Sequence, residues 1–197
     1  MKKIKTPKGE RIKDYNDLIL VALEGKKFNS ALEVGCGDGK NLVNIKEIYP
    51  NKKLVGFDND EAVLLKIGSC YRYYELKGIR MGYGNIIHCT RTQKYDVVFT
   101  AATLLLIERR KLLEKAIRNI VKFSKRWVIL IEMQDDDLGC EGLNQAENQI
   151  RMIRDYKRIM KKYGCDLVEE IVIPLEVWPG KNYTSECGRI MIFTKQK

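Results

Sequence analysis

Long apolar segments are missing from this chain of 197 residues, whose longest nearly apolar stretch covers only residues 97–107. A membrane helix needs roughly 18 to 20 such residues, so we expect no transmembrane segment. The basic first residues lead into a short apolar segment, residues 18–23, with no small-residue cleavage pattern behind it. This pattern predicts no signal peptide. We therefore expect a cytoplasmic protein with no membrane partner.

Closely spaced cysteine pairs are missing too. The six cysteines lie apart and form no CxxC motif, which argues against a zinc site or a disulfide framework. Proline is scarce, and we find no low-complexity tract, internal repeat or linker. With 45% apolar residues, the sequence predicts one folded domain over residues 1–197.

The charge is unbalanced, with 36 Lys and Arg against 26 Asp and Glu and a formal net charge of +10. This sign is typical of a protein that meets phosphate or another anionic partner. The basic residues are nevertheless spread along the chain, without the clustered stripe usual in nucleic-acid binding. Nucleic acid is thus a possible partner but not the favoured one, and the charge indicates no oligomeric state.

Strand-like and helical patterns alternate for five units. Alternation of this kind implies parallel strands with helical crossovers, and the short connection between the last two strands predicts an antiparallel hairpin. We therefore expect an α/β fold with a doubly wound, mostly parallel seven-stranded sheet, an antiparallel C-terminal hairpin and helices on both faces. The predicted strands are residues 31–34, 53–57, 79–83, 95–100, 127–133, 167–173 and 189–194, and the predicted helices are 12–23, 41–48, 61–76, 107–123 and 150–163.

The segment ALEVGCGDGK is the strongest local signal, because an apolar strand ends in glycines at 35, 37 and 39 and leads into a helix. Such glycines allow a tight turn and let a ligand approach the backbone at the helix N-terminus. The next strand ends in Asp58. In nucleotide-binding βαβ units an acid at this distance accepts hydrogen bonds from ribose hydroxyls.

Two ligand classes compete for this loop. The dinucleotide fingerprint is GxGxxG, whereas this chain has GxGxG preceded by Glu33. An acid at this place repels a pyrophosphate and suits a cationic ligand. The alternatives are a chance turn in another α/β protein and, for Asp58, a role as the N-cap of the following helix.

On these residues the chain resembles the class I S-adenosylmethionine-dependent methyltransferases, whose first motif is an acidic residue followed by xGxGxG. The resemblance covers nearly the whole chain and implies S-adenosylmethionine as the cofactor. That family usually has Gly-Asp after its third strand, where this chain has Gly84-Asn85. Cys36, inside the loop, is interpreted as chosen for size. The cofactor-binding residues that the resemblance implies are Glu33, Gly35, Cys36, Gly37, Gly39, Asp58, Asn59, Asn85, Ile86, Thr100 and Ala101.

Several catalytic signatures of related enzymes are absent. The segment YDVVFTAATLLLI resembles the fourth motif of that family but lacks the Asn/Asp-Pro-Pro-aromatic sequence of some members. No cysteine of the chain follows a proline, and leucines occupy the end of the fourth motif, where many relatives have a histidine. We expect no bound metal, because three consecutive loop acids such as Asp135, Asp136 and Asp137 usually remain solvated. The alternative is that they hold a hard cation through oxygen ligands. Glu132, near the end of the fifth strand, is the candidate general base. Its alternative role is to anchor a loop by hydrogen bonding.

Substrate-binding candidates lie outside the nucleotide half: Tyr15 in the first helix, and Trp178 and Tyr183 in the loop before the last strand. The resemblance implies methyl transfer to a small-molecule or metabolite acceptor by in-line displacement. The alternatives are an RNA methyltransferase, supported by net charge, and a non-catalytic subunit that binds the cofactor. The acceptor itself does not follow from the sequence.

Overall fold

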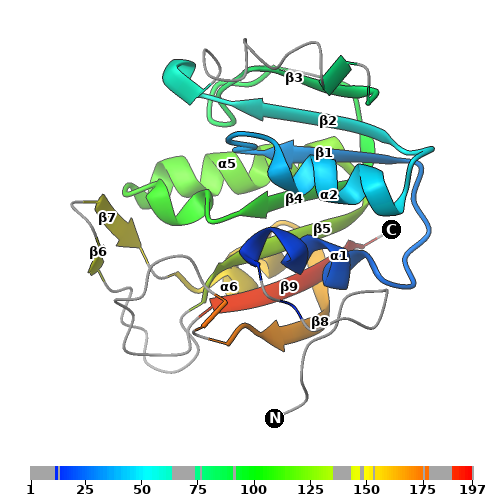
Figure 1. Ribbon diagram of the computed structural model, residues 1–197. Coiled ribbons are helices and arrows are strands. Elements are labelled where there is room, and N and C mark those ends of the chain that lie inside the picture. The colour runs from blue at the N-terminus through cyan, green and yellow to red at the C-terminus, as the bar shows by residue number, and fades with distance from the viewer. Residues whose placement is uncertain are drawn as a thin grey trace.

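The computed structural model describes residues 12, 14–63, 74–75, 77–90, 92–134, 143–146, 149–152, 154–174, 176–177 and 188–196. Its centre is a seven-stranded sheet in the order β3-β2-β1-β4-β5-β9-β8 (Figure 1). The strands are β1 (Ser30–Val34), β2 (Lys53–Asp58), β3 (Ile79–Tyr83), β4 (Tyr95–Ala101), β5 (Ser124–Met133), β8 (Cys165–Val172) and β9 (Gly188–Lys195).

The strand directions confirm the predicted fold class. Strands β1 to β5 pair in parallel, whereas β9 pairs antiparallel with both β5 and β8. The C-terminal hairpin therefore completes the sheet by inserting its last strand next to β5. The carboxyl ends of β1, β2 and β4 share the edge drawn on the left of Figure 1, and their amino ends share the opposite edge.

Helices cover both faces of the sheet. On one face, α1 (Leu18–Leu23) and α2 (Lys40–Ile48) pack on strand residues such as Ala31 and Val97. On the other face, α5 (Arg110–Phe123) and α6 (Tyr156–Lys162) pack on the alternate residues of the same strands, including Leu32 and Val98. This two-residue alternation divides the apolar core into two layers.

The helical pattern predicted for residues 150–163 is wrong in its first part. The segment opens as β7 (Gln149–Met152), which pairs antiparallel with β6 (Leu143–Ala146), and α6 begins only at Tyr156. The helix start is fixed by Asp155, whose side chain accepts a hydrogen bond from the backbone N–H of Arg158 at 3.0 Å. Strand pairing and this cap override the apolar spacing that favoured one longer helix.

Two other helices begin later than predicted. Residues 15–17 form the 3-10 helix η1 (Tyr15–Asp17) before α1, and η2 (Leu104–Leu106) precedes α5. Residues 61–63 and 74–75 of the predicted helix 61–76 are helical, and its remaining residues, 64–73 and 76, lie outside the described residues. No described helix is long and apolar enough to cross a membrane.

Candidate functional site

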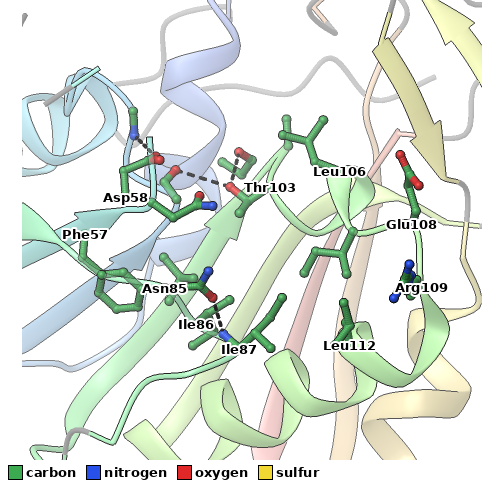
Figure 2. Close-up of a pocket in the computed structure, with 18 residues that line it drawn as sticks. Phe57, Asp58, Asn85, Ile86, Ile87, Thr103, Leu106, Glu108, Arg109 and Leu112 are labelled. Atoms are coloured by element: carbon green, nitrogen blue, oxygen red, sulfur yellow. Dashed lines mark hydrogen bonds between the residues drawn. The ribbon is translucent and has the colours of Figure 1, made fainter. Parts of the chain in front are cut away.

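A cavity of about 570 Å³ opens at the carboxyl ends of β1, β2 and β4 (Figure 2). This is the edge at which doubly wound sheets bind their ligands, and the volume suits a nucleoside-sized molecule. Its charged lining residues are the acids Asp58 and Glu108 and the cation Arg109. The glycine loop therefore contributes no basic side chain that would favour a phosphate group.

The glycine loop owes its shape to left-handed backbone at Gly35, Gly37 and Gly39, with φ of 72°, 49° and 78°. A Cβ on Gly35 would lie 2.3 Å from the side chain of Thr103, so no larger residue fits there. At Gly37, which lines the cavity, a Cβ would meet nothing within 4 Å. The bare backbone of Gly37 thus leaves space for a ligand, whereas Gly35 allows the loop to pack against the β4–α5 connection.

Asp58 ends β2 at the cavity wall and orders the glycine loop. Its Oδ2 accepts a hydrogen bond from the backbone N–H of Gly37 at 2.8 Å, and its Oδ1 accepts one from Asp60 at 2.9 Å. Each carboxylate oxygen has a second lone pair for a ligand hydroxyl. The alternative N-cap role belongs to Asp60, whose Oδ1 accepts from the backbone of Ala62 at 2.9 Å.

The segment after β3 forms the next wall. The Oδ1 atom of Asn85 accepts a hydrogen bond from the backbone N–H of Ile87 at 2.8 Å, which fixes the side chain at the cavity. Ile86, Ile87 and Phe57 add apolar surface beside it (Figure 2). An acceptor atom next to apolar walls suits a flat heteroaromatic ring that carries an amino group.

Glu33 lies beneath the glycine loop rather than in the cavity. It is 1% exposed, and its Oε1 accepts a hydrogen bond from Asn41 at 2.6 Å. Burial raises the pKa of this carboxyl well above its usual range. Its Oε2 has no hydrogen-bond partner within the part of the chain that the structure describes. Glu33 therefore fastens α2 to β1 and keeps one acceptor unused directly behind the loop.

Cys36 and Gly39 are also placed behind the cavity. Cys36 is buried, and its side chain would be 2.7 Å from a Cβ on Gly56. This tight fit agrees with the interpretation that the cysteine is chosen for size. Burial, the largest cause, raises the pKa of its thiol far above the ordinary value. Gly39 is the N-cap of α2 and packs near Met81.

Two neighbouring residues at the end of β4, both predicted to bind the cofactor, have different environments in the structure. Ala101 lines the cavity, whereas Thr100 is fully buried in the sheet and does not line it. The following Ala102 also lines the cavity and holds φ at 50°, a strained value for a residue with a Cβ. Thr103 then turns back, with its Oγ1 3.3 Å from the carbonyl oxygen of Gly35.

Glu132 is placed where it holds the chain after β4. It is fully buried and does not line the cavity. Its Oε1 accepts hydrogen bonds from the backbone N–H groups of Thr103 and Leu104, both at 3.1 Å, and its Oε2 accepts one from Leu105 at 3.3 Å. Burial raises the pKa of Glu132 to about 7. This geometry favours the anchoring alternative, although the loop it holds is the β4–α5 connection.

Of the predicted substrate residues, the described part of the chain includes only Tyr15. The hydroxyl of Tyr15 donates to the carbonyl oxygen of Ile131 at 3.3 Å, at the end of β5, and Tyr15 is not among the lining residues. Trp178 and Tyr183 lie outside the described residues, as do Asp135, Asp136 and Asp137. The described residues hold no group of three His, Cys, Asp or Glu side chains that could bind a metal ion.

Several lining residues were missed by sequence reasoning. They belong to the β4–α5 connection and the start of α5, and Figure 2 shows Leu106, Glu108, Arg109 and Leu112 across the cavity from Asp58. Residues 102–107 belong to the fourth-motif segment YDVVFTAATLLLI, of which only Thr100 and Ala101 were assigned to the cofactor, and residues 108–112 carry no motif. These residues are Ala102, Thr103, Leu106, Ile107, Glu108, Arg109 and Leu112.

The family of methyltransferase domains matches residues 26–190, so this chain belongs to that family. It is a methyltransferase that uses S-adenosylmethionine as its cofactor. The glycopeptide N-methyltransferase MtfA has a similar structure, with a TM-score of 0.73 at 9% identity over 93% of this chain and 91% of that one. A comparison with curated protein sequences gives no significant match.

Two further solved structures share the fold. The CcbJ methyltransferase from Streptomyces caelestis has a TM-score of 0.70 at 14% identity, covering 95% of this chain and 92% of that one. The magnesium protoporphyrin IX methyltransferase ChlM from Synechocystis PCC 6803, crystallised with S-adenosylhomocysteine, has a TM-score of 0.66 at 15% identity over 91% and 80% of the two chains. At these identities the likeness concerns the fold.

The cavity fits this cofactor on its own features. The ligand has a ribose diol, a flat adenine ring and positive charge but no phosphate. The chain offers an acidic acceptor at Asp58, apolar walls with a polar acceptor at Asn85, and bare backbone at Gly37. Buried Glu33 keeps one oxygen without a hydrogen-bond partner among the described residues, so it can still form a polar contact.

Proposed function

We propose that this protein transfers a methyl group from S-adenosylmethionine to a small-molecule acceptor by in-line displacement. The observation that carries the proposal is the continuity of one cavity from Asp58 to the end of β4. At that end the lining residues Ala101 and Ala102 have only methyl side chains, which leave space for an acceptor. Magnesium protoporphyrin IX, the substrate in the name of ChlM, is an acceptor of this general kind.

The proposed residue roles follow the cavity from one end to the other. Asp58 accepts hydrogen bonds from the ribose hydroxyls, and Asn85 with Ile86 holds the adenine ring. Asn59, which also lines the cavity, contacts the ribose from the rim. The glycine loop receives the methionine part, with Glu33 behind it and Ala101 beside the methyl group.

Chemistry at this site depends on alignment more than on acid–base catalysis. The bound cofactor supplies a methyl group that its sulfonium has already activated. Of the described residues that line the cavity, only Asp58 and Glu108 carry carboxylates, and Figure 2 shows them at opposite ends. Orientation of two reactants can lower the reaction barrier by roughly 7 to 11 kcal/mol, so a site that mainly aligns the cofactor and the acceptor can accelerate the transfer.

A transfer assay tests the acceptor class. The protein is incubated with methyl-labelled cofactor and, separately, with a deproteinised metabolite extract and with total RNA. We expect label in the small-molecule fraction, and much less of it with the Asp58→Ala variant. Label in RNA alone would replace the proposal by the RNA methyltransferase alternative.

A further inference from the structure

The sheet edge opposite the cavity carries two neighbouring basic hollows of about 620 and 600 Å³. The charged residues that line the first hollow are Lys26, Lys27, Lys52 and Arg126 with one acid, Asp96. Those that line the second are Lys46, Lys52, Lys53 and Arg80 with one acid, Glu75. Lys52 lines both hollows, so they are direct neighbours. We call the cations Lys26, Lys27, Lys52, Lys53, Arg80 and Arg126 the basic edge.

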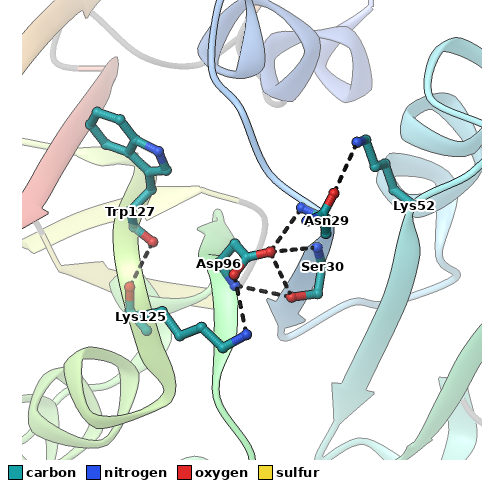
Figure 3. Close-up of polar contacts among 7 residues, drawn as sticks. Asn29, Ser30, Lys52, Asp96, Lys125 and Trp127 are labelled. Carbon is teal, nitrogen blue, oxygen red and sulfur yellow. Dashed lines mark hydrogen bonds and ion pairs between the residues drawn. The ribbon is translucent and has the colours of Figure 1, made fainter.

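The acid in the first hollow does not neutralise these cations. Asp96 directs its Oδ2 at the backbone N–H groups of Asn29 and Ser30, at 2.8 and 3.0 Å, and its Oδ1 lies 3.2 Å from Lys125 (Figure 3). Its charge is thus used to fasten β4 to the start of β1 and to pair with a lysine outside the hollow. Four cations against this one acid leave the lining of the first hollow with a net positive charge.

Among the described residues, Lys26 of the basic edge pairs with Glu169, whereas the other five cations have no carboxylate partner: Lys27, Lys52, Lys53, Arg80 and Arg126. Aromatic rings hold two of them in place. The ammonium of Lys52 lies 5.4 Å from the ring centroid of Phe28, and the guanidinium of Arg126 lies 4.8 Å from that of Trp127. Cations fixed over rings lose less freedom when they bind an anion.

The extent of the basic edge decides between anion classes. From Arg126 on β5 to Arg80 on β3 it crosses β4, β1 and β2, which is four strand steps of about 4.8 Å, or about 19 Å. A single phosphate needs only a small part of that length, whereas a chain of phosphates uses all of it. A membrane presents a flat surface and does not enter hollows.

We propose that the basic edge binds the phosphodiester backbone of single-stranded RNA. Cationic grooves lined by aromatic side chains are the usual platform for single strands, with sequence-tolerant contacts. The strands separate this edge from the cavity by roughly 20 Å, the length of six residues at about 3.3 Å each. RNA bound there leaves the cofactor cavity open, so the inference does not depend on which acceptor is methylated.

The test measures binding of a fluorescent oligouridylate by anisotropy at several salt concentrations. For the triple variant Lys27→Gln, Lys52→Gln, Arg126→Gln we expect at least tenfold weaker binding at low salt. The slope of log K against log salt should decrease in magnitude by about 2, since each lost contact to a single strand contributes about 0.7. The matched control replaces Lys111, Arg118 and Lys161, exposed cations of α5 and α6, by Gln.

The control should bind the oligonucleotide within twofold of the wild type. Equal weakening of both triple variants would overturn the proposal, because it would mean diffuse attraction by net charge. Undetectable binding by the wild type at about 50 mM salt would overturn it as well. So would tighter binding of phosphatidylserine vesicles that is lost in the Lys27, Lys52, Arg126 variant.

Two further measurements keep the result interpretable. S-adenosylhomocysteine binding by calorimetry should be the same in both triple variants, which separates this inference from the proposed function. If the first triple variant does not fold, Lys27→Gln alone replaces an exposed side chain. This single variant should still lower the salt slope by about 0.7, and an unchanged slope would contradict the proposal.

Discussion

The anchor at Glu132 makes a prediction about stability and pH. Its carboxyl group is fully buried, and burial raises its pKa from the model-peptide value of 4.5 to about 7 in the folded protein. Between these values the folded state binds more protons than the unfolded state. The free energy of unfolding must therefore fall as pH rises through this window, and the stability from the protonated carboxyl is complete only below about pH 4.5.

The magnitude follows from the same shift. A difference of about 2.5 pKa units corresponds to about 3 kcal/mol, at roughly 1.36 kcal/mol per unit. The Glu132→Gln variant has no ionisable group at this position and should lack this part of the pH dependence. Its amide can still accept hydrogen bonds from Thr103 and Leu104 through one oxygen, but its NH2 group faces the backbone N–H of Leu105. That loss should cost about 1 to 3 kcal/mol.

Guanidinium unfolding at pH 5 and pH 8, followed by tryptophan fluorescence, measures both effects. We expect the stability difference between wild type and Glu132→Gln to be larger at pH 5 than at pH 8, by about 2 to 3 kcal/mol. Subtracting the variant removes the contributions of other carboxyls, including buried Glu33. An equal difference at both pH values would refute a raised pKa at Glu132. A variant as stable as the wild type at pH 5 would refute the anchor.

Three further predictions follow. Once an acceptor is known, Glu132→Gln should change kcat by less than tenfold, and a decrease of about 100-fold or more with intact cofactor binding would restore Glu132 as a base. Gly37→Ala should lower the free energy of unfolding by about 1 kcal/mol and also weaken S-adenosylhomocysteine binding. The control Gly25→Ala, also at positive φ, should lower stability alone, and equal affinities in the two variants would contradict a ligand at Gly37. Ala102→Gly should raise the free energy of unfolding by about 1 kcal/mol, because φ there is 50° and glycine adopts this value without strain. A variant that is less stable than the wild type in thermal unfolding would mean that the packing of the Ala102 methyl group outweighs the backbone strain.

The sequence predicted those parts of the molecule that depend on local pattern. The glycines at 35, 37 and 39 require left-handed backbone wherever the chain makes this turn, and Asp58 ends an apolar strand at the expected distance. The alternation of strands and helices likewise determined the sheet and its C-terminal hairpin. Each of these signals arises from residues close together in the chain.

The parts that were missed depend on contacts between distant residues. An anchoring role for Glu132 was one of the two alternatives, but the loop that it holds was not predicted. Glu132 reaches Leu104 across 28 residues, and no spacing rule connects a buried acid in β5 with the backbone after β4. Thr100 is buried in the sheet, whereas its neighbour Ala101 lines the cavity. This difference follows from the alternation of side chains along β4, but the sequence does not say which of the two side chains faces the cavity. At residues 150–152, strand pairing with β6 outweighed a helical apolar spacing.

Binding of S-adenosylhomocysteine measured by calorimetry on the wild type, Asp58→Ala and Asp60→Ala tests the central claim most directly. The Asp58→Ala variant loses hydrogen bonds to the two ribose hydroxyls, each worth about 1.5 to 3 kcal/mol, so it should bind S-adenosylhomocysteine at least tenfold more weakly. Asp60 caps the next helix without lining the cavity, so its variant should bind like the wild type. Heat from NAD but none from S-adenosylhomocysteine, or equal affinities for Asp58→Ala and wild type, would contradict this account of the site.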